Sequence, residues 1–450
     1  MNKTTKLEDK NEGTWHFDNC ECFHGTLNKE DNGIYYLEIS TDQPDIELID
    51  KLLESSVSIV TRNAYGTLKT GVKISLFNIN LLNMSTTATK TDLSTTQKYQ
   101  CKWICIGDSY CKSIDETKIQ KLKAQYYNFN AWFQQSFSKD HMKKNNETGD
   151  IEEIDKQEPI FELEINRNCS DYKIGFNQNG VLEFSFNSPT NLLDSLKELQ
   201  KLTDFLILCY GEITTTESIR FIDENKKEFE LIIPDKNKGN ISKLFSNDFF
   251  IQFSFIKDNF QSCYKKWLDT YELWKPTIAY FVESHERTFH IPISFLKIVQ
   301  ALEVFSRRTR KNIILDEEDF SDLKKRLEND IKNENDKKLV LKLLSNEPRL
   351  RQRLKDLFKE VDCFFEISSR KRDSLAFKIS QTRNYYTHFD ISHEDKKCIY
   401  NNEQIFYVSQ YMKFVLKVLL LKEINVDDRV IANQLVNDQE YITAKKKLDL

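Results

Sequence analysis

The chain has 450 residues, of which 39% are hydrophobic and 12% aromatic, with only 11 glycines and 7 prolines. This composition excludes collagen-like and broadly disordered proteins, and the length predicts two or three folded domains. The 65 basic residues nearly balance the 70 acidic ones, which gives a net charge of −5. That balance argues against a protein that coats nucleic acid with its whole surface, although a local basic groove is compatible with it.

The cysteines and the apolar segments bear on the cellular compartment. Ten cysteines are spread thinly over the chain, unlike the dense disulfide framework of a small secreted domain. The first residues, MNKTTKLEDKNEGTWHF, contain no apolar signal core. The most apolar segment, FVLKVLLL, is expected to be too short and too interrupted by lysine to cross a bilayer. We therefore expect a cytoplasmic protein with reduced thiols and no membrane partner.

The first part of the chain alternates polar and apolar side chains at a period of two, which predicts β-strands. Residues 25–40, GTLNKEDNGIYYLEIS, predict a hairpin that turns at residues 31–33. A helix is expected at 190–211, between Asn191 as N-cap and Gly211 as its end. Further strands are predicted for SVSIVTR, GVKISLFNI, YQCKWICIG, IFELEIN, YKIGF, VLEFSFN, SIRFID, EFELIIP and FFIQFSF.

From about residue 258 the apolar spacing becomes helical. Two of the predicted helices carry apolar stripes, formed by Phe295, Val299, Leu302 and Phe305 and by Leu323, Leu327 and Ile331. The predicted fold class is α+β. It comprises a β-rich N-terminal domain at 1–257, a helical linker at 258–288 and an all-α C-terminal bundle at 289–450.

The segment RNYYTHFD, residues 383–390, concentrates arginine, asparagine and histidine in a chain with only seven histidines. On a helix, Asn384 and His388 lie one turn apart, opposite the core-facing stripe of Leu375, Ile379, Thr382, Tyr386 and Phe389. Arg383 and His388 are about 140° apart on a straight helix. A lone helical histidine is often only structural, and that reading stays open here. A second copy of this helix, packed antiparallel across a two-fold axis, would bring the two side chains together more easily.

The RNYYTHF segment matches the R-x-x-x-x-H signature, with Asn after Arg, of HEPN domains. The segment FLKIVQALEVFSRR resembles the first helix of the Apea-like HEPN branch, and KKWLDTYELWKPTIAYFV resembles the linker before it. LLDSLKELQKLTDFLILCYGEITTTESIRF and the early HGTL…GIYYLEI resemble the N-terminal domain found with that branch. Motif, first helix and domain order together carry this resemblance over most of the chain.

The resemblance implies a metal-independent ribonuclease that works as a homodimer through its helical domain, and a role in defence against phage. It makes Arg383 and His388 the catalytic pair, with Asn384 in support and Glu303 at the acidic position of the first helix. RNA supplies its own nucleophile, the 2′-hydroxyl. An imidazole can accept and return protons at neutral pH, and an arginine can hold phosphate oxygens with two hydrogen bonds. The partner is then cellular RNA, with tRNA as one candidate.

Two basic segments, SRRTRKN and SSRKRD, lie near these residues in sequence. They supply the candidate RNA-binding residues Arg307, Arg308, Arg310, Arg370 and Arg372. The alternative is that these cations only stabilise the end of a helix.

No strong metal or cofactor motif is present. The group of Cys20, Cys22 and His24 and the group of Cys101, Cys105 and Cys111 lack paired zinc spacing. Glycine-rich nucleotide motifs are also missing. We therefore expect neither a metal nor a cofactor.

Two functions remain open at this point. The first is an anti-phage effector of the abortive-infection type, which cleaves cellular RNA. Its N-terminal domain would gate this activity and detect a phage-derived trigger. The second is a non-catalytic HEPN scaffold for dimerisation or ligand binding.

Overall fold

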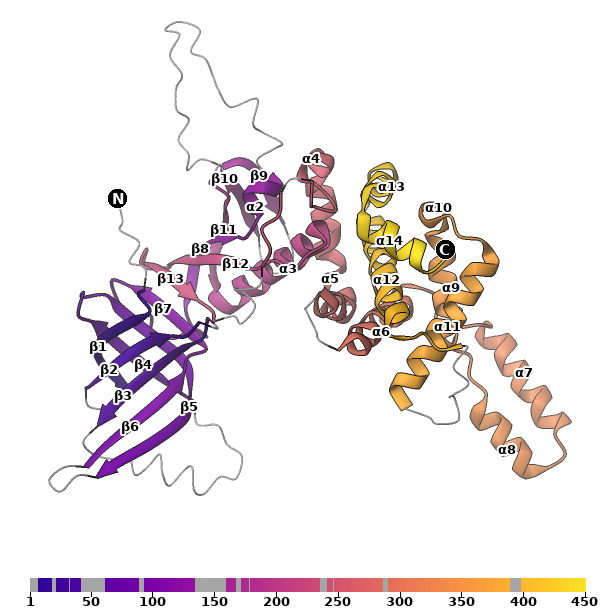
Figure 1. Cartoon of the computed structure of the whole chain (residues 1–450), viewed down its shortest axis with the longest axis horizontal. Coiled ribbons are helices and arrows are strands. Elements are labelled where there is room, and N and C mark those ends of the chain that lie inside the picture. Colours follow the sequence, from indigo (N-terminus) through magenta and orange to yellow (C-terminus); the bar gives the residue numbers. More distant parts are fainter. Residues whose placement is uncertain are drawn as a thin grey trace, which may run out of the picture. The chain divides into compact units, whose positions relative to one another are not determined.

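The computed structural model of the chain describes residues 7–17, 22–31, 33–41, 61–88, 93–133, 159–166, 171–177, 179–234, 241–245, 247–285, 290–388 and 398–450. The chain forms two compact units (Figure 1). The first unit contains residues 1–203 and 214–249, and the second contains 204–213 and 250–450. This division differs from the expected end of the N-terminal domain at residue 257.

The first unit is built on a sheet that has 13 strands within the described residues. The strands run in the order β4-β1-β2-β3-β6-β5-β7-β13-β12-β8-β11-β10-β9, and β4 also pairs with β5. This extra pairing closes six strands into a barrel, from which the sheet continues through β7. The strands are β1 (Lys10–Phe17), β2 (Phe23–Lys29), β3 (Tyr35–Thr41), β4 (Thr61–Leu68), β5 (Lys73–Ala88), β6 (Leu93–Gln100), β7 (Trp103–Gly107), β8 (Lys118–Tyr126), β9 (Pro159–Ile165), β10 (Tyr172–Asn177), β11 (Val181–Asn191), β12 (Thr216–Asp223) and β13 (Glu228–Ile232).

The barrel interior is apolar and centres on the fully buried Trp15. Trp15 lies opposite Gly66 across the β1–β4 pair. A Cβ atom at Gly66 would come within 2.5 Å of the indole ring, so only glycine leaves room for this tryptophan. Burial of the indole and of the surrounding aliphatic side chains supplies the hydrophobic stabilisation of the barrel.

Two local predictions for the first 211 residues are confirmed. The hairpin at 25–40 is the antiparallel pair β2–β3, whose turn uses the positive φ of Gly33 (78°). The predicted helix at 190–211 is α3 (Leu192–Tyr210). The side chain of Asn191 accepts from the Leu193 N–H at 2.9 Å, and Gly211 ends the helix with a φ of 78°.

Other strand predictions need correction. YQCKWICIG was expected to be one strand, but it belongs to two, β6 and β7. The expected strand FFIQFSF instead forms bends and the short helix α4 (Phe253–Ile256), because a short apolar run does not distinguish a strand from a buried helical segment. Strands β1 and β8 were not anticipated. Most of SVSIVTR lies outside the described residues, and β4 begins at Thr61.

The second unit is helical, and its long apolar helix α12 packs against α5, α6, α13 and α14. Besides α4 and the end of α3, its helices are α5 (Phe260–His285), α6 (Ile291–Thr309), α7 (Glu317–Asp330), α8 (Glu334–Leu343), α9 (Leu350–Glu360), α10 (Asp362–Phe365), α11 (Ser369–His388), α12 (Asn402–Glu423), α13 (Asp428–Asn437) and α14 (Gln439–Lys447). A further short helix, α2 (Phe129–Phe133), belongs to the first unit. The α+β fold class is therefore confirmed.

Helix α12 was expected to be too short for a membrane span, and this was wrong. By length and composition alone, its 22 residues would be enough to cross a membrane. However, 72% of its most apolar window is buried within the structure, as in the core helix of a bundle. Helix α7 is less buried than its apolar stripe suggested. None of its residues is buried, and Leu323, Leu327 and the following Ile331 are only half-buried.

Candidate functional site

The candidate site lies where helix α11 packs against helix α6. The predicted stripe of α6, Phe295, Val299, Leu302 and Phe305, is at most 1% exposed. In α11, Leu375, Ile379 and Thr382 are buried, Tyr386 is half-buried, and Phe389 lies outside the described residues. The apolar stripes therefore orient the two helices and bring Glu303 of α6 near Arg383 of α11.

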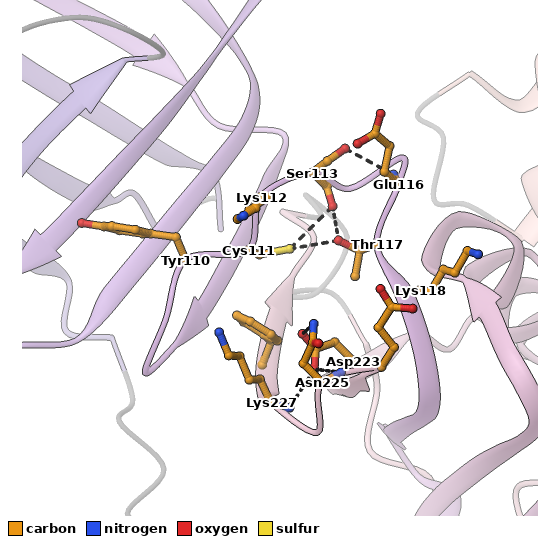
Figure 2. A pocket seen from close by; sticks show the side chains of 12 residues that line it. Tyr110, Cys111, Lys112, Ser113, Glu116, Thr117, Lys118, Asp223, Asn225 and Lys227 are labelled. Atoms are coloured by element: carbon orange, nitrogen blue, oxygen red, sulfur yellow. Dashed lines mark hydrogen bonds between the residues drawn. The ribbon is translucent and has the colours of Figure 1, made fainter.

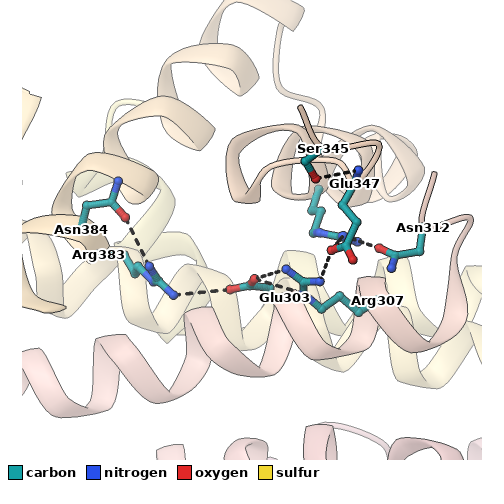
Figure 3. A network of polar contacts seen from close by, with 8 residues as sticks. Glu303, Arg307, Asn312, Ser345, Glu347, Arg383 and Asn384 are labelled. Atoms are coloured by element: carbon teal, nitrogen blue, oxygen red, sulfur yellow. Dashed lines mark hydrogen bonds and ion pairs between the residues drawn. The ribbon is translucent and has the colours of Figure 1, made fainter. Parts of the chain in front are cut away.

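Glu303 is a buried carboxylate that faces two arginines (Figure 3). Its Oε1 accepts hydrogen bonds from Arg307 Nη2 at 3.1 Å and Nε at 3.2 Å. Its Oε2 lies 3.8 Å from Arg383 Nη2. A buried carboxylate is costly unless it is paired, so the two guanidinium groups are what make this position tolerable for glutamate.

Arg383 is also joined to its neighbour in the chain. Its Nη1 donates to Asn384 Oδ1 at 3.3 Å, and 29% of its side chain is exposed. The structure thus brings together three of the four predicted catalytic residues, Glu303, Arg383 and Asn384. The remaining guanidinium N–H groups of Arg383 keep hydrogen-bonding capacity for an anion.

His388 is placed differently from these three. It is the last residue of α11, it is exposed, and it has no hydrogen-bond or ion-pair partner among the described residues. It follows Asn384 by one helical turn, and the helical period directs it away from Arg383. The prediction that His388 points away from the core is confirmed, and the single chain does not join its imidazole to the guanidinium of Arg383.

The polar network extends beyond the predicted residues. Arg307 Nη1 donates to Glu347 Oε2 at 2.5 Å, and the same Glu347 oxygen lies 3.6 Å from Arg353 Nη2. Arg353 also donates to Asn312. Sequence reasoning missed Glu347 and Arg353. The sequence signal for Arg353 is its place in the apolar pattern of α9, where it shares the buried face with Leu354 and Leu357.

Arg353 is 1% exposed, and its Nε and Nη1 atoms have no hydrogen-bond partner among the described residues. Burial, followed by repulsion from Arg307, lowers the pKa of Arg353. The hydrogen bond to Glu347 has the opposite effect on Arg307, whose pKa is raised. Glu347 thus helps to hold two like charges close to Glu303.

Most of the predicted RNA-binding arginines already contact protein groups. Arg307 pairs with Glu303 and Glu347, Arg310 pairs with Glu360 and Glu423 at 2.6 Å, and Arg372 pairs with Asp362. Arg308 donates to the Leu273 carbonyl. Arg370 is exposed and has no such partner among the described residues. Arg370 and Arg308 are therefore the two of the five that have no carboxylate partner among the described residues.

Nothing in the described residues groups three or more histidine, cysteine or acidic side chains in a manner that could hold a metal ion. His285 is half-buried, and its Nδ1 lies 2.8 Å from the Phe281 carbonyl oxygen.

Comparison with known families gives the class of this protein. Residues 296–430, which contain most of α6 and all of α9 and α11, match the Apea-like HEPN domain. Residues 10–267, more than half of the chain, match ApeA N-terminal domain 1. No curated protein and no solved structure matches the chain.

The chain therefore belongs to the Apea-like HEPN family, with an ApeA-type N-terminal domain. This pair of domains points to a family of anti-phage HEPN effectors. HEPN domains are generally ribonucleases that act as dimers on RNA.

Proposed function

We propose that the protein is a metal-independent endoribonuclease that cleaves cellular RNA through attack by the RNA's own 2′-hydroxyl. The observation that carries this proposal is the position of Arg383, held between Glu303 and Asn384 with part of its side chain exposed (Figure 3). A fixed arginine with free N–H groups suits a phosphodiester, whose oxygens gain negative charge during the reaction.

Each residue has a role in this mechanism. His388 accepts the proton of the 2′-hydroxyl, whose oxygen forms a bond to phosphorus. The bond from phosphorus to the 5′-oxygen breaks, and that oxygen receives a proton from the imidazolium. Arg383 binds the phosphate oxygens, Asn384 supports Arg383, and Glu303 fixes the guanidinium from its buried side. The products are a 2′,3′-cyclic phosphate and a 5′-hydroxyl.

A homodimer completes the site in this proposal. Arg383 and His388 project from different sides of α11, so the histidine of one subunit is taken to serve the arginine of the other. The β-rich unit gates the activity and detects a phage-derived trigger. Cleavage in the cytoplasm of RNA, with tRNA as one candidate, then halts the infected cell.

Induced expression in a bacterial host tests this function. We expect the triggered wild-type protein to arrest growth and fragment RNA, while Arg383→Ala and His388→Ala accumulate to the same level and do neither. Arrest with intact RNA, or equal arrest by both variants, would overturn the proposal.

One observation favours the non-catalytic scaffold as a second candidate. The charge of Arg383 is already opposed by Glu303 within one chain, as in a structural ion pair. The scaffold predicts that His388→Ala leaves RNA intact and growth unchanged relative to wild type, while Glu303→Gln weakens assembly.

A further inference from the structure

A small pocket in the first unit has a cysteine in its wall (Figure 2). It has a volume of about 230 Å³ and lies between the segment that joins β7 to β8 and the turn that joins β12 to β13. Cys111 lines it together with side chains of both charges, namely Lys112, Lys118, Lys227, Glu116, Asp223 and Glu224. Cys111 itself is buried, with 3% of its surface exposed, so the pocket borders a thiol that is otherwise enclosed by protein.

Hydrogen bonds fix the position of Cys111. Its backbone N–H donates to Ser75 Oγ at 3.0 Å. Its Sγ lies 3.5 Å from Thr117 Oγ1 and 3.7 Å from the Ser113 carbonyl oxygen, and Figure 2 shows the sulfur directed toward both groups. The thiol is therefore held in one orientation within a short connecting segment.

A second thiol lies next to this one. Cys105 on β7 is directly opposite Ser75 on β5, so the two side chains share one face of the sheet. Because Ser75 Oγ also accepts from Cys111, the segment containing Cys111 lies over that same face. The thiols of Cys105 and Cys111 are near enough that each shifts the pKa of the other.

The two thiols are chemically unequal. The hydrogen bond from Cys105, helped by Thr117, lowers the pKa of Cys111 to about 7. The same contact and burial raise the pKa of Cys105 well above its usual value. A thiol with a pKa near neutrality is a reactive nucleophile, and an adjacent thiol can resolve its oxidised form.

The helical unit offers a contrasting pair of neighbouring thiols. Burial raises the pKa of Cys209 well above its usual value and that of Cys263 to about 11. Neither thiol is activated, although both are near each other and buried. Proximity and burial alone therefore do not distinguish the Cys105–Cys111 pair, whereas the lowered pKa of Cys111 and the pocket beside it do.

We propose that Cys111 and Cys105 form a peroxide-reactive dithiol that closes reversibly into a disulfide. The Cys111 thiolate attacks one oxygen of hydrogen peroxide, an S–O bond forms and the O–O bond breaks. The departing hydroxide takes up the proton that Cys111 released. Cys105 then attacks the Cys111 sulfur, the S–S bond forms, and the hydroxyl leaves as water with the Cys105 proton. Two thiols are oxidised by two electrons and one peroxide is reduced to two waters.

In the test, the reduced full-length protein is treated with hydrogen peroxide and then alkylated with N-ethylmaleimide in denaturant. Mass spectrometry of the intact protein counts the alkylated thiols. We expect wild type to lose two of its ten alkylatable thiols. Peptide mapping should show a Cys105–Cys111 crosslink that dithiothreitol reverses. Retention of all ten thiols, or a crosslink between other cysteines, would overturn the proposal.

Three variants sharpen the test. In Cys105→Ser, Cys111 should carry a sulfenic acid that dimedone traps, since the resolving thiol is missing. In Cys111→Ser, no disulfide should form. Cys263→Ser is the matched control, from the unactivated pair, and should still lose two thiols to the crosslink. A Cys263→Ser protein that forms no crosslink, or a Cys111→Ser protein that still loses two thiols, would contradict the assignment.

Discussion

Glu303 Oε2 on α6 lies 3.8 Å from Arg383 Nη2 on α11, and it is the buried partner of that pair. This relationship joins the first helix of the HEPN bundle to the helix that carries the R-x-x-x-x-H motif. In the proposed mechanism Glu303 is a positioning residue, because its carboxylate faces the guanidinium rather than solvent.

The first prediction concerns Glu303→Gln. Loss of the carboxylate charge frees Arg383 to move, and a displacement of about 1 Å at a catalytic group costs about 100-fold in rate. We expect a fall in kcat of about 10- to 100-fold with a smaller change in KM, measured on a defined RNA.

Glu347→Gln is the matched control for that prediction. Glu347 belongs to the same network but pairs with Arg307 and Arg353 rather than with Arg383. Its substitution should leave the rate within about threefold of wild type. Equal losses in the two variants would mean that the network acts as a whole and that Glu303 has no special role.

The second prediction concerns the dimer. If His388 of one subunit serves Arg383 of the other, a mixed dimer of Arg383→Ala and His388→Ala chains contains one intact site. Mixing the two inactive proteins under conditions of subunit exchange should then restore up to about a quarter of the wild-type rate, because half of the dimers are mixed and each has one of two sites. Mixtures that stay inactive, although exchange is demonstrated by mass, would place both residues of a site in one chain.

The third prediction concerns Arg353, which is buried with two nitrogen atoms that have no partner among the described residues. Arg353→Met keeps the volume and removes a buried charge, and Glu347 retains Arg307 as its partner. We expect urea unfolding to place Arg353→Met within about 1 kcal/mol of wild type. Arg353→Ala should lose about 2–4 kcal/mol through the cavity it leaves. A methionine variant as unstable as the alanine variant would show that the charge itself stabilises the bundle.

The fourth prediction concerns acid stability. Burial, with Lys413 and Lys417 nearby, lowers the pKa of His285 well below 6.5. The unfolded chain takes up a proton as the pH falls through about 6.5, but the folded protein does not, so acid favours unfolding. The contribution of His285 is therefore present above about pH 6.5 and is lost below it.

Thermal unfolding of wild type and His285→Gln measures this contribution. We expect Tm to fall between about pH 7 and pH 5 and the fall to be smaller in the variant, because glutamine does not titrate there. An identical slope in both proteins would remove His285 as a cause.

The fifth prediction concerns gating by the β-rich unit. The end of α3 belongs to the helical unit, where Tyr271 donates to Asp204 at 2.5 Å and Phe205 packs on Phe260. A truncation should therefore begin at Leu192, so that α3 is retained. We expect this protein to cleave RNA without an infection trigger, and the added His388→Ala change to abolish the cleavage. A folded truncation that stays inactive would reject autoinhibition by the removed part.

Local patterns predicted the elements whose signals lie close together in sequence. The stripe of α6, the hairpin at Gly33 and the cap of α3 by Asn191 each depend on residues within a few positions of one another. Strand β1 was missed because its inward positions include Asn11 and Gly13, which do not look like core residues. The prediction of a strand at 249–255 was wrong because an apolar run of that length is compatible with either a strand or a buried helix.

For the candidate site, the sequence identified residues but not the contacts between them. The motif identified Arg383, Asn384 and His388, and the resemblance added Glu303. Their tertiary relationships could not be read from spacing, since Glu347 and Arg353 reach the network from segments distant in sequence. The ion pairs of Arg307, Arg310 and Arg372 were likewise hidden, because a run of basic residues does not reveal which carboxylates fold against it.

The most direct test of the ribonuclease claim is cleavage of RNA by purified, triggered protein in the presence of EDTA, with Arg383→Ala and His388→Ala beside wild type. The proposed mechanism predicts that wild type still cleaves and leaves 2′,3′-cyclic phosphate ends, and that both variants lose at least about 100-fold in rate. Cleavage that EDTA abolishes, or that both variants retain, would contradict it.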